Sequence, residues 1–156
     1  MRTFAAIKNR KIRLAIVGCG RISKNHFDSI EKHQNNVELV SICDNHQKTL
    51  SEKQAKYKVN GYLDLSDMLI KEDLDLVAIC TPSGIHAEQT KLCANHGVNV
   101  MTEKPMATRW EDGLSMVKVC DEAAVRLLVV KQNRRNPTLQ ILKRAITENR
   151  FGKIYM

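Results

Sequence analysis

An apolar run that leads straight into two closely spaced glycines constrains this 156-residue chain more than any other feature. Residues 13–27 read RLAIVGCGRISKNHF, which predicts a strand, a turn at Gly18 and Gly20, and a helix that begins near Ser23. A second apolar run, VELVSIC, is followed by Asp44. A strand, a glycine turn, a helix and a second strand closed by an acid form the unit that holds a dinucleotide in doubly wound α/β proteins.

The residue types in this turn suit a phosphate ligand. Gly18 permits the tight bend, and Gly20, which has no Cβ, lets the backbone approach a pyrophosphate. Amide groups and the dipole at the start of the helix then meet the negative charge. Ser23 stands where a third glycine or an alanine is usual, so we expect slightly looser packing of the helix on the strand.

Asp44 is the acid expected to accept hydrogen bonds from an adenosine ribose. It follows the second strand, close to the distance of about 20 residues after the glycine turn at which such an acid is found. A carboxylate there repels a 2′-phosphate, which favours NAD over NADP. His46 and Lys48 lie close by and would weaken that repulsion. The alternative is an ordinary turn acid that starts the next helix.

Length and composition indicate one soluble, cytoplasmic α/β domain. The chain is long enough for one full hydrophobic core, and no apolar run reaches the ~20 residues that a membrane-spanning helix needs. Its cysteines are odd in number and lie mostly in apolar runs, which predicts buried, reduced thiols with no disulfide and no metal site. They are Cys19, Cys43, Cys80, Cys93 and Cys120.

A net charge of +8 raises the alternative of a nucleic-acid-binding protein. The basic residues are scattered over several expected helices, often beside acids, and aromatic residues make up only 4% of the chain. Solvated helix faces and attraction for anionic nucleotides explain this charge better, so we expect neither nucleic acid nor membrane as a partner.

Short apolar runs alternate with helical stretches, which predicts a doubly wound parallel sheet, the Rossmann fold. The expected strands are residues 12–17, 37–43, 57–60, 75–80, 98–101 and 126–131. We expect Ser83 to cap one helix and Thr108 with Glu111 to form a capping box at another. Asn136 and Pro137 should open a helix that runs to about Asn149.

The sequence after that helix reads GKIYM, which resembles the start of a further strand. We therefore expect residues 1–150 to form a dinucleotide-binding domain and residues 151–156 to begin a second, truncated domain.

Polar segments follow two of the expected strands, CTPSGIH at residues 80–86 and MTEKPMA at residues 101–107. Both would lie at the carboxyl edge of the sheet, where ligands bind. Lys104 is the candidate catalytic residue, because a lysine partly desolvated beside a cationic nicotinamide can accept a hydroxyl proton. The alternative is a surface lysine before a turn proline.

Several strings together resemble the Gfo/Idh/MocA family of NAD(P)-dependent sugar oxidoreductases: AIVGCGRIS, CTPSGIHAE, EKPMA and QNRRNPTLQILKRAITENRFGKIYM. The ending VVKQNRRNPTLQ is similar to members that act on UDP-N-acetylglucosaminuronate in lipopolysaccharide O-antigen synthesis. In this family a second α+β domain, absent from the chain, covers the active site and supplies most of a homo-oligomer interface. The resemblance thus implies that this chain alone binds NAD(H) without oxidising a sugar.

The resemblance also implies roles for individual residues. The pyrophosphate would be held by Gly18, Gly20, Arg21, Ile22 and Ser23, and the adenosine ribose by Asp44. The rest of the NAD site would comprise Thr81, Pro82, Glu103 at the nicotinamide ribose, and Lys104. An anionic sugar-nucleotide substrate would meet Lys104, which orients the reacting hydroxyl, and would be bordered by Gln132, Asn133 and Arg134.

The histidines are expected to have local roles. We expect His86 to bond nearby backbone, and the other four to be solvated or to cap helices: His26, His33, His46 and His96. Two alternatives to a sugar-nucleotide dehydrogenase stay open at this point. One is another sugar or inositol dehydrogenase of the same family, and the other is a non-catalytic dinucleotide-binding module.

Overall fold

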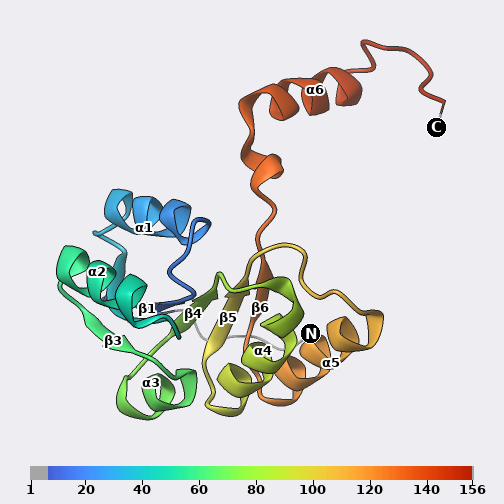
Figure 1. The fold of residues 1–156 in the computed structure, drawn as a ribbon. Helices are drawn as coiled ribbons and strands as arrows, with labels where there is room; N and C mark the ends of the chain where they lie inside the picture. Colours follow the sequence, from blue (N-terminus) through green and yellow to red (C-terminus); the bar gives the residue numbers. More distant parts are fainter. Residues whose placement is uncertain (1–6, 156) are drawn as a thin grey trace.

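The computed structural model describes residues 7–155, which form a six-stranded parallel sheet flanked by helices (Figure 1). The strand order is β3-β2-β1-β4-β5-β6, so the order reverses between β1 and β4. The strands are β1 (Ile12–Val17), β2 (Val37–Cys43), β3 (Asn60–Tyr62), β4 (Leu76–Ile79), β5 (Asn99–Thr102) and β6 (Leu127–Val129). This is the doubly wound Rossmann arrangement that the alternating pattern predicts.

The connections between strands are helical. They contain α1 (Ser23–Lys32), α2 (Gln47–Tyr57), α3 (Leu65–Lys71), α4 (His86–Asn95) and α5 (Trp110–Glu122). Two short 3-10 helices, η1 (Ser83–Ile85) and η2 (Gln132–Arg135), precede α4 and α6 (Pro137–Thr147).

Alternate residues of the strands feed two separate hydrophobic cores. On one face Leu14 and Ile16 pack with Phe27 of α1 and Leu50 of α2. On the other face, neighbouring strand residues such as Val17 pack with residues of α3 and α4. Because successive side chains of a strand point to opposite faces, both faces of a continuous apolar strand are buried here.

The third strand differs from the prediction of residues 57–60. Helix α2 extends to Tyr57, whose ring stacks on that of Phe27 with centroids 4.1 Å apart. Lys58 then ends the helix in the left-handed conformation, with φ of 53°, and the strand forms at Asn60–Tyr62. The stacking holds Tyr57 in the helix, which displaces the strand toward the carboxyl end.

Two of the three predicted side-chain caps at helix starts are wrong. Arg109, without a side-chain cap, precedes α5, so Thr108 and Glu111 form no capping box. Ser83 lies in η1, and α4 begins only at His86. The third is confirmed, since Asn136 Oδ1 accepts hydrogen bonds from the N–H groups of residues 138 and 139 at 3.0 and 3.3 Å, although α6 ends at Thr147.

Helix α6 stands away from the sheet, beyond η2 (Figure 1). Its apolar side chains are largely exposed, with Ile141 71% accessible. Residues 151–155 form no strand in the part of the chain that the structure describes. The expected domain limits include residues 1–6 and Met156, which lie outside the described residues.

All five cysteines are buried, as predicted. Burial raises the pKa of the thiols of Cys19, Cys43, Cys80 and Cys93 to about 12. These thiols therefore pack as small apolar groups. Within residues 7–155, no helix has the length and apolar character needed to cross a bilayer.

Candidate dinucleotide-binding site

A cleft of ≈ 540 Å³ opens at the carboxyl ends of β1, β2 and β4, beside the reversal of strand order. In doubly wound proteins this crevice is where ligands bind. Sequence reasoning singled out several of the residues that line it: Gly18, Gly20, Asp44, Thr81 and Pro82.

The two glycines of the turn serve different purposes. Gly18 has a φ of 85°, and a Cβ built on it would lie 2.9 Å from backbone atoms of Cys80 and Thr81. Its N–H donates to the Cys43 carbonyl at 2.8 Å, which fixes the turn to the end of β2. A Cβ on Gly20 meets nothing within 4 Å. Gly18 is therefore needed for the fold of the turn, while Gly20 leaves open space in the cleft.

Ser23 does more than occupy the place of a third glycine. Its side chain is fully buried, and its hydroxyl donates a hydrogen bond to the Gly20 carbonyl at 2.6 Å. This bond closes the turn just where α1 begins. Among the described residues no side chain caps the start of α1, so its first N–H groups are available to an anion.

Asp44 is attached directly to the glycine turn. One carboxylate oxygen, Oδ2, accepts from the Cys19 N–H at 2.7 Å, and the other, Oδ1, accepts from the His46 N–H at 2.8 Å. Each oxygen keeps a lone pair that a ribose hydroxyl can reach. Asp64, which sequence reasoning did not single out, lines the same cleft, where its carboxylate caps α3.

Thr81 and Pro82 line this cleft after β4, which lies on the other side of β1 from β2 and Asp44. The Thr81 hydroxyl donates to Gln89 Oε1 at 2.6 Å, and Gln89 is itself a lining residue. The hydroxyl is thus held by α4, which gives this part of the cleft a fixed shape.

Glu103 and Lys104 follow β5, outside the lining of this cleft. Glu103 is buried, at 7% exposure, whereas the neighbouring Lys104 is exposed. Residues 7–155 alone therefore do not supply the desolvation expected for Lys104.

The expectation for His26 is wrong, and that for His86 is confirmed. His26 is neither solvated nor a helix cap, because its Nε2 lies 2.9 Å from Glu103 Oε1 and both side chains are nearly buried. His86 lies with its ring nitrogens 2.9 and 3.1 Å from the carbonyl oxygens of Thr81 and Pro105. His46 caps α2 as expected, accepting from the Thr49 N–H at 3.4 Å.

Gln132, Asn133 and Arg134 form η2 and are exposed. Asn133 and Arg134 border a separate hollow of ≈ 520 Å³ together with residues of α6. The Arg134 carbonyl accepts a hydrogen bond from the Gln140 side chain, which joins η2 to α6. In Figure 1 this segment continues from the carboxyl end of β6. Because the strands are parallel, it leaves the sheet at the same edge as the glycine turn after β1.

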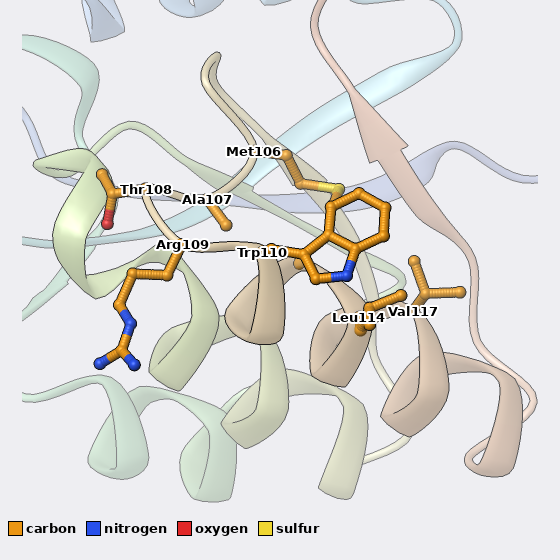
Figure 2. A pocket seen from close by; sticks show the side chains of 8 residues that line it. Met106, Ala107, Thr108, Arg109, Trp110, Leu114 and Val117 are labelled. Atoms are coloured by element: carbon orange, nitrogen blue, oxygen red, sulfur yellow. The ribbon is translucent and has the colours of Figure 1, made fainter.

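A third cavity, a hollow of ≈ 430 Å³, lies on the outer surface of α5 and is lined in part by the segment that precedes this helix (Figure 2). Its wall is mostly apolar and includes Met106, Leu114 and Val117 around the indole ring of Trp110, which is 76% exposed. Arg109 points away from this ring in Figure 2. Sequence reasoning did not single out this hollow, since a tryptophan at a helix start gives no distinctive pattern.

The strand order, the glycine turn and the pinned acid define a Rossmann domain of the dinucleotide-binding class. The chain belongs to the Gfo/Idh/MocA oxidoreductase family and carries its NAD-binding Rossmann fold, with the family model matching residues 12–131.

Solved structures of WlbA dehydrogenases are similar to this chain over nearly its whole length. The protein from Bordetella pertussis is 54% identical, with a TM-score of 0.91, over 94% of this chain and 45% of that one. The protein from Chromobacterium violaceum is 53% identical, with a TM-score of 0.95, over 100% of this chain and 45% of that one. Both were crystallised in complex with NADH and UDP-GlcNAcA.

Curated relatives are more distant. The 4-carboxy-2-hydroxymuconate-6-semialdehyde dehydrogenase of a Sphingobium strain is 36% identical over 86% of this chain and 43% of its own length. The D-glucoside 3-dehydrogenase of Escherichia coli is 29% identical over 97% of this chain and 44% of its own length. The chain thus spans less than half the length of these relatives.

Proposed function

We propose that the full-length protein is an NAD-dependent dehydrogenase that oxidises a secondary hydroxyl of a sugar nucleotide resembling UDP-N-acetylglucosaminuronate, for lipopolysaccharide O-antigen synthesis. The observation that carries this proposal is the identity of 53% to 54% with two WlbA dehydrogenases solved with NADH and UDP-GlcNAcA. All five cysteines are buried free thiols, as is typical of proteins in a reducing compartment, so we propose a cytoplasmic location.

The cleft beside the glycine turn is the proposed NAD site. The pyrophosphate would lie against the backbone of Gly20 and residues 21–23, where open space and available N–H groups adjoin. Asp44, held by the Cys19 N–H, would accept hydrogen bonds from the adenosine ribose. Thr81 and Pro82 would line the same cleft after β4. NAD, when bound, supplies the nicotinamide that accepts the hydride.

Lys104 is the proposed base. Removal of a hydride from an alcohol carbon leaves a hydroxyl proton, which a positioned base accepts in the transition state. Lys104 follows β5, next to the buried Glu103, which would approach the nicotinamide ribose. Gln132, Asn133 and Arg134 would border the anionic sugar nucleotide from η2. Their charge and amide groups suit the phosphate and carboxylate oxygens of such a substrate.

We propose that residues 1–150 form the NAD-binding domain and that residues 151–156 belong to the start of a second domain in the full-length protein. Two observations support this division. The apolar side chains of α6 are exposed, and the chain covers only 45% of the solved Bordetella pertussis protein. A second domain would also supply the desolvation that Lys104 needs, and we expect the full-length protein to be a homo-oligomer.

The test is a kinetic assay of the full-length protein with NAD and UDP-GlcNAcA, followed by NADH absorbance. Lys104→Met keeps the length of the side chain and removes its amine, so we expect kcat to fall by ~10²–10⁴-fold. Lys118→Met, at an exposed position on α5, is the matched control and should leave kcat unchanged. Unaltered kcat in Lys104→Met would exclude the proposed base.

Substrate profiling separates this function from the alternatives. Preference for a free sugar or an inositol over UDP-GlcNAcA would favour another dehydrogenase activity of the family. Tight NADH binding with no turnover of any of these alcohols would favour a non-catalytic dinucleotide-binding module.

A further inference from the structure

The segment that carries Lys104 is held from the inside of the molecule. The Glu103 side chain is only 10% exposed, and its Oε2 accepts a hydrogen bond from the Lys104 N–H at 3.2 Å. Glu103 is buried while Lys104 is exposed, so a buried side chain directly precedes one that reaches solvent. The backbone of Lys104 is therefore positioned by its neighbour's side chain.

Glu103 is in turn held by a distant helix. His26 belongs to the first turns of α1, 77 positions earlier, and its Nε2 lies 2.9 Å from Glu103 Oε1. A carboxylate oxygen accepts hydrogen bonds, so Nε2 is the donor. The two side chains are only 11% and 10% exposed, which makes this bond costly to lose, because a buried carboxylate would remain without its donor.

A second histidine holds the other end of the same segment. His86, at 1% exposure, lies between the carbonyl oxygens of Thr81 and Pro105. Thr81 is a wall residue of the cofactor cleft, so His86 connects that wall to the residue after Lys104. The Glu103–Pro105 segment is thereby tied to two helices, to α1 by His26 and to α4 by His86.

From this chain of contacts we infer that His26 is a positioning residue, which acts through Glu103 to fix the place of Lys104 relative to the bound cofactor. The inference rests on the proposed function, in which Lys104 is the base. Helix α1 begins at the turn that would hold the pyrophosphate, so one rigid element sets both the cofactor and, by way of Glu103, the base. Displacement of a catalytic group by about 1 Å can cost ~10²-fold in rate.

The kinetic test compares three variants of the full-length protein. His26→Ala removes the donor, and we expect kcat to fall ~10- to 100-fold while the KM values for NAD and for UDP-GlcNAcA change less than about threefold. His26→Gln retains a side-chain N–H and should recover most of kcat. His33→Ala, an exposed histidine just after α1, is the matched control and should behave as wild type.

A double-mutant cycle tests the route through Glu103. In the Glu103→Gln background, His26→Ala should add little further loss, because the two residues act as one unit. An equal loss in both backgrounds would overturn the inference, as would a His26→Ala variant with wild-type kcat. A rise confined to the KM for NAD would also overturn it, because His26 would then support binding alone.

A spectroscopic measurement keeps the inference testable if the proposed function fails. In amide NMR spectra of the protein, the Lys104 N–H resonance should shift in His26→Ala and stay near its wild-type position in His26→Gln and His33→Ala. An unmoved resonance in a folded His26→Ala protein contradicts the positioning role. Absence of sugar-nucleotide oxidation by the wild type, with the shift observed, rejects the proposed function and leaves the positioning role of His26 standing.

Discussion

The carboxylate of Asp44 accepts a hydrogen bond from the Cys19 N–H at 2.7 Å, so the acid after the second strand is fixed to the middle of the glycine turn. The two parts of the dinucleotide motif, 25 positions apart, therefore act as one structural unit. Asp44 both shapes the turn and presents its remaining lone pairs to the cleft.

Asp44→Asn should weaken NADH binding by about 10- to 100-fold, because hydrogen bonds to a charged group are worth roughly 1.5–3 kcal/mol. NADPH should lose less affinity than NADH, since the charge that repels its 2′-phosphate is removed. Titration calorimetry with both nucleotides measures the two effects. Glu52→Gln, an exposed acid on α2, is the control for the general loss of one negative charge. Equal losses for NADH and NADPH would contradict the discriminating role of Asp44.

The two glycines of the turn should respond differently to alanine. Gly18→Ala places a Cβ 2.9 Å from the backbone of Cys80 and Thr81 at a φ of 85°, so we expect a loss of about 1–3 kcal/mol in the free energy of unfolding. Gly20→Ala meets nothing within 4 Å and should unfold like the wild type. It should nevertheless bind NADH at least about tenfold more weakly, because the methyl group occupies the space of the pyrophosphate. Urea unfolding and NADH titration of both variants measure these effects. A Gly20→Ala variant that is destabilised but binds NADH normally would contradict the role of Gly20 in making space for the pyrophosphate.

Asp75 should make the stability of the domain depend on pH. The Arg10 guanidinium, helped by the Arg13 N–H, lowers the pKa of the Asp75 carboxyl below its ordinary value. Because the folded-state pKa is the lower one, the carboxylate stabilises the fold above about pH 4, and this contribution is lost as the pH falls through the folded-state value. Asp75→Asn should therefore cost about 1 kcal/mol at pH 7 and much less at pH 3. Urea unfolding between pH 3 and pH 7 measures this loss of stability. Asp73→Asn is the control, because the Asp73 side chain is 93% exposed. A difference that does not depend on pH would contradict the ion pair as its source.

The buried cysteines should be unreactive in the folded protein. Burial holds the pKa of four thiols at about 12, so few thiolates are present at pH 8. We expect the thiols to react with a disulfide reagent at least about 100-fold more slowly in the native state than in urea, where all five become accessible. Rapid native reaction of even one thiol would contradict its burial.

Much of this fold could be predicted from the sequence because the relevant signals are local. The apolar runs are long and are separated by helical stretches, so five of the six strands form close to their predicted positions. The third strand could not be placed, because the stacking of Tyr57 on Phe27 is a tertiary contact between residues 30 positions apart. Local propensity does not report such a contact.

The site divides in the same way. The positions of Gly18, Gly20 and Asp44 follow from spacing along the first strand–helix–strand unit, and all three line one cleft. The partner of His26, Glu103, directly follows β5, far along the chain, and a histidine on a helix face has the same sequence pattern whether it is solvated or paired. The approach of Glu103 to α1 depends on the order of the strands in the sheet, in which only β4 separates β5 from β1.

The most direct test of the proposed site is a crystal structure of the protein with NADH. We predict that the pyrophosphate lies against the backbone between Gly20 and Ser23 and that the adenosine ribose hydroxyls donate to Asp44. A dinucleotide bound elsewhere, or an adenosine ribose turned away from Asp44, would contradict the assignment of this cleft.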